Sequence, residues 1–173
     1  MSSSPSVDEF LANSQELRKR CRMTSKIHYN QEEVCRAINF CLGLTAAVFG
    51  ALTAATQSAV SADIPPLLLR ISPILTGVAA AALAYLEPAS MAGKYHAAGV
   101  QYGELERRAR TWEIGLQSQL AVGARSEQSI EAARASLEQL WTTKSQLDKD
   151  MPLASELVKM YTQRRVKGKP LDK

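Results

Sequence analysis

The sequence has few of the residues from which catalytic and metal sites are built. It contains only two histidines, His28 and His96, which lie far apart in the sequence, and three cysteines. The cysteines, at positions 21, 35 and 41, provide neither a disulfide framework nor the paired spacing of a metal site. No phosphate-binding loop or nucleophile motif is present. We therefore expect no enzymatic activity, no cofactor and no metal.

Charge is scarce in two long stretches in the first half of the chain. Residues 37–62 include no charged side chain, and a second apolar stretch, interrupted by Arg70, continues to Leu86. As a helix, the first stretch would reach about 39 Å, more than the ~30 Å hydrocarbon core of a bilayer. We expect a hairpin of two transmembrane helices, at about residues 37–62 and 64–87.

Lysine and arginine are distributed unevenly around these two stretches. Six precede Ala37, one lies between the stretches and fourteen follow Leu86. Because basic residues are in excess on the cytoplasmic side of membrane proteins, we expect both termini in the cytoplasm. Basic residues beside a membrane also favour anionic lipid. The lipid bilayer is therefore the expected partner, and the net charge of +4 does not require nucleic-acid binding.

The polar remainder of the chain predicts further helices. Residues 1–13 are polar and serine-rich and are expected to be disordered, whereas residues 14–36 form a charged cytoplasmic helix. After Pro88, apolar residues three and four apart predict two helices of a bundle or coiled coil. Residues 151–173 are expected to form a short helix and a basic tail. The main apolar positions, which we call the bundle seam, are Tyr95, Tyr102, Leu105, Trp112, Leu137 and Leu140.

One face of the first apolar stretch carries small and hydrogen-bonding side chains. Either this face packs on the second helix or another copy, or several copies arrange it around a shared axis as a pore lining. Two helices cannot enclose a water path, so a pore needs several chains, and both interpretations predict a homo-oligomer. The residues of this polar stripe, spaced four and three apart, are Asn39, Gly43, Ala46, Gly50, Thr53 and Gln57.

The segment that follows the hairpin resembles a known family. Residues 94–107 read Lys-Tyr-His-Ala-Ala-Gly-Val-Gln-Tyr-Gly-Glu-Leu-Glu-Arg. In this position the segment resembles the SLATT family, the SMODS and SLOG-associating two-transmembrane effectors, and in particular its fungal branch. We therefore expect a SLATT-like domain over residues 14–150. The resemblance implies a pore-forming or membrane-perturbing effector of a conflict or cell-death response. It transfers no catalytic residue, and we expect this chain to differ from the family in carrying no sensor or synthase domain.

The expected fold is therefore all-α, an integral membrane hairpin with a cytoplasmic N-terminal helix and a C-terminal helical bundle. The expected function is that of a homo-oligomeric membrane effector. The main alternative is a non-conducting membrane anchor or scaffold that recruits partners through its cytoplasmic helices. A third interpretation is a soluble bundle that buries both apolar stretches.

Overall fold

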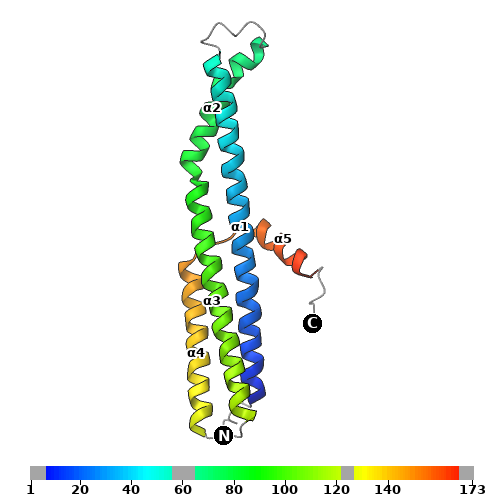
Figure 1. Cartoon of the computed structure of the whole chain (residues 1–173), viewed down its shortest axis with the longest axis vertical. Coiled ribbons are helices and arrows are strands. Elements are labelled where there is room, and N and C mark those ends of the chain that lie inside the picture. Colours follow the sequence, from blue (N-terminus) through cyan, green and yellow to red (C-terminus); the bar gives the residue numbers. More distant parts are fainter. Residues whose placement is uncertain (1–6, 56–64, 122–126, 168–173) are drawn as a thin grey trace. The chain divides into compact units, whose positions relative to one another are not determined.

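The computed structural model describes residues 7–55, 65–121 and 127–167, and every regular element within these ranges is a helix (Figure 1). The all-α class predicted from the sequence is confirmed for these residues. In chain order the helices are α1 (Val7–Ala55), α2 (Pro66–Leu86), α3 (Pro88–Ala121), α4 (Glu127–Asp150) and α5 (Glu156–Lys167).

The chain divides into two compact units. The bundle unit combines residues 1–31 with residues 94–173, and the hairpin unit consists of residues 32–93. The first part of α1, most of α3, α4 and α5 therefore belong to the bundle unit. The second part of α1, α2 and the start of α3 belong to the hairpin unit.

Helix α1 begins earlier than the sequence analysis predicts. Residues 7–13 are helical rather than disordered, because the Phe10 side chain is buried in the core of the bundle unit. Asp8 and Glu9 lie in the first turn, where acidic side chains stabilise the positive end of a helix. Residues 1–6 and the basic tail from residue 168 lie outside the described residues, as do the last residues of the first predicted span, 56–62.

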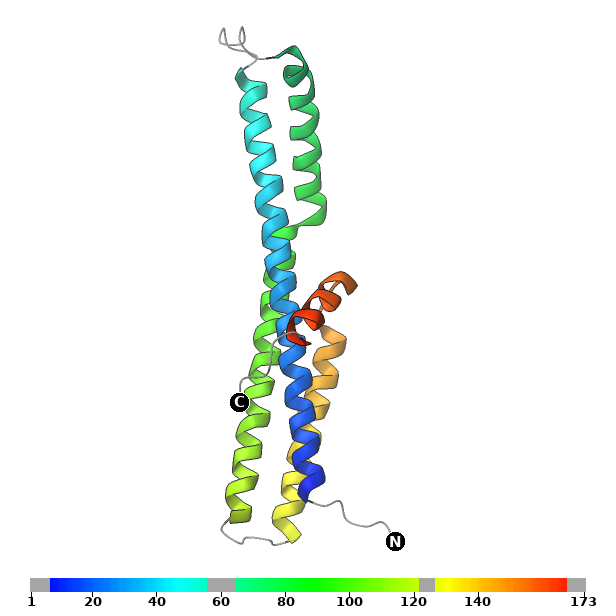
Figure 2. The same cartoon turned by 90° about the vertical axis from the view of Figure 1, so that its right-hand side faces the viewer.

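Prolines and one left-handed residue determine the ends of α2. Pro66 occupies the first helical position, where the missing N–H has no intrahelical acceptor to lose. At the other end Glu87 has a φ of 40°, and its N–H donates to the Leu83 carbonyl oxygen. Since Pro88 follows, the helix cannot continue in register. Figure 2 shows the resulting break between α2 and α3.

The core of the bundle unit forms where α1, α3 and α4 lie side by side (Figures 1 and 2). Apolar residues spaced three and four apart share one helix face, so each helix contributes one stripe to this core. Half-buried side chains, among them Trp112 and Trp141, pack around it. The buried members are Phe10, Leu17, Cys21, Leu105, Ala109, Leu116 and Leu137.

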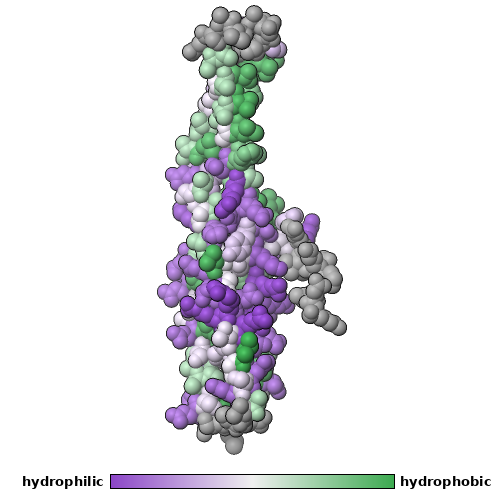
Figure 3. Space-filling model, viewed as in Figure 1, coloured by the Kyte–Doolittle hydropathy of each residue, from purple (hydrophilic) through white to green (hydrophobic). Residues whose placement is uncertain are grey.

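The hairpin unit has a different surface. The second part of α1 lies beside α2, and residues 36–55 include no buried residue. On α2, Ser72 and Ala79 are buried, whereas Ile74 and Val78 are exposed. Figure 3 shows apolar surface over the hairpin helices and mostly hydrophilic surface over the bundle unit. The described part of the hairpin unit therefore exposes large apolar side chains on both of its helices.

Candidate functional site

The polar stripe of α1 contacts α2 near the C-terminal end of α1. The Thr53 and Ser72 hydroxyl oxygens lie 3.2 Å apart, and the Ser72 side chain is buried. A Cβ atom added at Gly50 would lie 3.8 Å from Thr76 Cγ2. These stripe residues therefore take part in helix packing within one chain.

The earlier part of the stripe has more space around it. Asn39, Gly43 and Ala46 are half-buried, and a Cβ atom added at Gly43 would meet nothing within 4 Å. The same holds for Gly77 on α2. Gln57, the last stripe residue predicted from the sequence, lies outside the described residues. The close approach to α2 thus occurs in the later part of the stripe, and Gly43 is open to a further helix.

Three threonine hydroxyl groups in the described part of the hairpin unit donate to the backbone of their own helix. Such bonds satisfy a polar side chain without water, as lipid surroundings require. The carbonyl acceptor lies four residues earlier in each case, at 2.8 Å: Thr45 donates to Cys41, Thr53 to Phe49 and Thr76 to Ser72.

The bundle seam lies inside the bundle unit. Tyr95, Tyr102, Leu105 and Leu137 are buried. The remaining two members, Trp112 and Leu140, are half-buried and pack against the core. The seam residues therefore pack against other residues of the same chain.

The segment that carries the family resemblance lies against α1. A Cβ atom added at Gly99 would lie 3.2 Å from the Tyr29 ring, and the Ser25 hydroxyl donates to the Gly99 carbonyl at 2.8 Å. A Cβ atom added at Gly103, one turn later, would lie 3.7 Å from the Ser25 hydroxyl oxygen. The glycines of this segment thus allow close approach of two helices.

A polar layer, which the sequence analysis missed, crosses the interior of the bundle unit. The buried His28 ring stacks on Tyr95 and Tyr102, with ring centroids 5.9 and 5.5 Å away. The Tyr102 hydroxyl donates to Asp148 Oδ1 at 2.7 Å, and Lys144 Nζ donates to Oδ2. The spacing of the two tyrosines shows that they share a face, but no sequence signal marks His28 as their partner.

Burial and hydrogen bonding determine the charges of this layer. Burial lowers the pKa of His28, and burial together with the bond to Asp148 raises the pKa of Tyr102. Burial acts to raise the pKa of Asp148, but the hydrogen bonds from Lys144 and Tyr102 outweigh it and lower the pKa. Burial also raises the pKa of the nearby Cys21 thiol to about 11. The layer therefore holds a neutral imidazole and an unreactive thiol.

The neutral His28 predicts an acid-sensitive bundle. As pH falls below about 6.5, the unfolded chain binds a proton at this histidine that the folded chain excludes. The free energy of unfolding should therefore fall, by at most about 1.4 kcal/mol per pH unit, until pH reaches the lowered pKa. Thermal unfolding of the full chain in detergent, followed between pH 7.5 and pH 5, measures this slope.

Two variants identify the histidine responsible. His28→Phe should flatten the pH dependence, whereas His96→Gln, at an exposed position, should retain it. Equal acid sensitivity in the wild type and His28→Phe would assign the effect to other groups.

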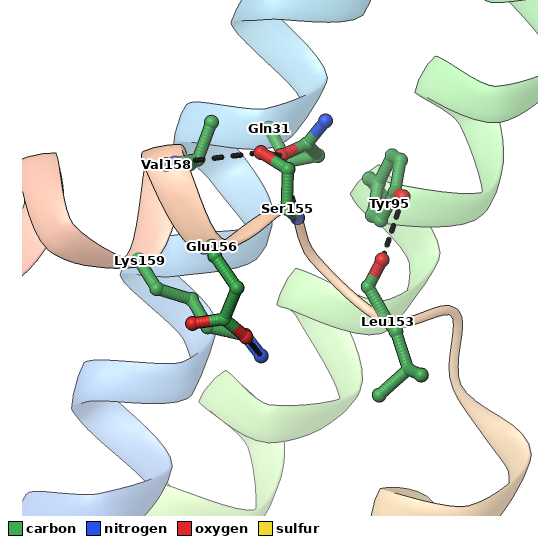
Figure 4. A network of polar contacts seen from close by, with 7 residues as sticks. All are labelled: Gln31, Tyr95, Leu153, Ser155, Glu156, Val158 and Lys159. Carbon is green, nitrogen blue, oxygen red and sulfur yellow. Dashed lines mark hydrogen bonds and ion pairs between the residues drawn. The ribbon is translucent and has the colours of Figure 1, made fainter.

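Helix α5 is attached to α1 through Ser155 (Figure 4). The Ser155 backbone N–H and the Ser155 hydroxyl both donate to Gln31 Oε1, at 3.3 and 3.1 Å. The same hydroxyl oxygen accepts the Val158 N–H at 3.4 Å, the geometry of an N-cap. One serine thus begins α5 and connects it to α1.

Two further hydrogen bonds hold the segment in place. The Tyr95 hydroxyl donates to the Leu153 carbonyl oxygen at 3.0 Å (Figure 4). Asn30 Nδ2 donates to the hydroxyl oxygen of Thr162, a fully buried residue, at 2.7 Å. The residues before α5 and the interior of the helix are therefore both connected to the rest of the bundle unit.

Comparisons with family models, with curated proteins and with solved structures found no match to this chain. Within the described ranges, no three histidine, cysteine, aspartate or glutamate side chains are grouped as metal ligands. Function is therefore inferred from the two units themselves.

Proposed function

We propose that this protein is an integral membrane effector whose hairpin unit spans a bilayer. The observation that carries the proposal is the exposure of large apolar side chains on both hairpin helices, such as Phe40, Val48, Ile74 and Tyr85. Water-soluble monomers rarely expose a contiguous apolar patch of this kind. A core helix of a soluble protein can be equally long and apolar, but it is mostly buried. In the most apolar stretch of the first candidate helix 0% is buried, and in that of the second 11% is buried.

Both termini and the bundle unit lie in the cytoplasm in this proposal, as the basic residues on either side of the hairpin favour. Single cysteines in a background that lacks the three native ones test this topology. In intact cells, an impermeant maleimide should label position 62, at the outer end of the first span, and should label position 145 only after permeabilisation. Labelling of both positions in intact cells, or of position 145 alone, would contradict the hairpin topology.

The effector acts as a homo-oligomer that perturbs the membrane, through a pore lined by several chains. The resemblance to SLATT effectors supports this function, as does the space beside Gly43 and Gly77. Small residues allow helices of different chains to approach closely. A neutral lining of this kind would discriminate poorly between ions.

A non-conducting anchor or scaffold is the second candidate, and the Thr53–Ser72 contact favours it. This contact uses part of the polar stripe inside one chain, which leaves fewer groups to line a path. The recruiting surface would then belong to the bundle unit.

Asn39→Leu separates the two functions, and Thr53→Val is the control variant on the same stripe. Thr53→Val removes a hydrogen bond worth about 0.6 kcal/mol in a membrane, so leakage and oligomer mass should change little. Asn39→Leu should lower dye leakage from reconstituted vesicles while oligomer mass is retained, because an apolar constriction loses its water. A wild-type protein that assembles but never releases dye would exclude the pore and leave the scaffold.

A further inference from the structure

Helix α5 carries an apolar stripe on the side that faces away from α1. Leu157 is 75% exposed, Tyr161 58% and Met160 49%, and Leu153 just before the helix is 83% exposed. Residues three and four apart share a helix face, so these side chains form one surface. Val158 and Thr162, on the other side, are buried against the bundle unit. The attachment of α5 thus leaves its most apolar surface in contact with solvent.

The sequence of α5 and of the residues that follow it is rich in basic residues. Arg164, seven residues after Leu157, lies on the same helix face and is exposed. Residues 156–173 include six basic and two acidic residues, and one of the acidic residues, Glu156, pairs with Lys159 at 2.7 Å. A helix with an apolar face and a surplus of lysine and arginine fits the interface of an anionic membrane.

The attachment point of α5 lies close to the first apolar stretch in the sequence. Its partners Asn30 and Gln31 precede Ala37, the start of that stretch, by six or seven residues. A chain of this length spans at most about 25 Å in any conformation. If the hairpin unit is in the bilayer, the point at which α5 is attached to α1 is therefore within this distance of the start of the first span.

We propose that α5 binds the cytoplasmic surface of an anionic membrane. Leu157, Met160 and Tyr161 enter the headgroup region, and Arg164 contacts lipid anions. This inference rests on the membrane function proposed above. It assigns α5 the role of a second, peripheral attachment that fixes the bundle unit against the membrane.

Hydrogen exchange of the full chain in nanodiscs tests the proposal. Discs of phosphatidylcholine are compared with discs that also contain phosphatidylserine. Amides of α5 should exchange at least roughly fivefold more slowly in the anionic discs. Each basic residue near an anionic surface raises the binding constant by about this factor. The double variant Leu157→Gln, Tyr161→Gln should lose this difference. Gln163→Ala, at an exposed position outside the apolar stripe, should keep it.

Resistance of the protein to carbonate extraction from vesicles distinguishes the two proposals. Equal α5 exchange in both kinds of disc, with extraction resistance retained, overturns the inference and leaves the membrane function intact. Complete extraction overturns both. Slowing that depends on the number of chains per disc, and not on lipid charge, overturns the inference because a second copy then covers the stripe.

Discussion

Replacement of Leu105 by aspartate is expected to unfold the bundle unit. Leu105 is 2% exposed and belongs to the core cluster that joins α1, α3 and α4. Removal of a buried leucine side chain costs about 2 to 5 kcal/mol. The carboxylate would add the cost of an unpaired buried charge, several kcal/mol more. Because whole domains are stable by about 5 to 15 kcal/mol, the sum approaches or exceeds the total.

Circular dichroism and thermal unfolding of the purified full chain in detergent measure this effect. Ile114→Asp is the matched control, since Ile114 lies on the same helix and is 56% exposed. It should change the free energy of unfolding by about 0.5 kcal/mol or less. Trp112→Asp should lie between the two, because Trp112 is half-buried. A Leu105→Asp protein that melts like the wild type would show that the bundle seam is not the core.

The arrangement of α3 in the bundle unit follows from its sequence because side-chain direction repeats with the helical turn. Residues three and four apart along α3 share a face, and Tyr95, Tyr102 and Leu105 on that face are buried. The long uncharged stretches likewise predict helices, because an apolar segment without a break has to satisfy its backbone internally in lipid. Helix α2, at residues 66–86, lies within the stretch predicted for the second span.

Polar residues whose partners come from other helices could not be placed in this way. Asp148 on α4 accepts a hydrogen bond from Tyr102 on α3, and the spacing of residues within α4 does not indicate this partner. His28 is polar by type and buried by position. The contact of Thr53 with Ser72 depends on the register between two helices, which the spacing within either helix does not specify. The helical start at Val7 depends in the same way on a tertiary contact, that of Phe10.

Replacement of Val48 by arginine is expected to prevent stable insertion of the hairpin. Val48 lies near the middle of the first apolar stretch and is 48% exposed. A charged side chain at the centre of a membrane helix costs about 3 kcal/mol or more, which is over a hundredfold in the insertion equilibrium. On a surface that faces water, the same change would alter stability by about 0.5 kcal/mol or less. The variant therefore distinguishes lipid from water as the surroundings of this face.

The chain offers a closely matched control at Val100. Val100 is also a helical valine, 46% exposed, but it lies on α3 in the bundle unit. Val100→Arg should leave the carbonate-resistant fraction of the protein unchanged, whereas Val48→Arg should reduce it severely. Val48→Leu should keep it at the wild-type level, because the side chain stays apolar. If both arginine variants behave like the wild type, the exposed face of the hairpin is in contact with water and the membrane proposal is lost. If only Val48→Arg fails to insert, the apolar surface of the hairpin unit is the surface that meets lipid.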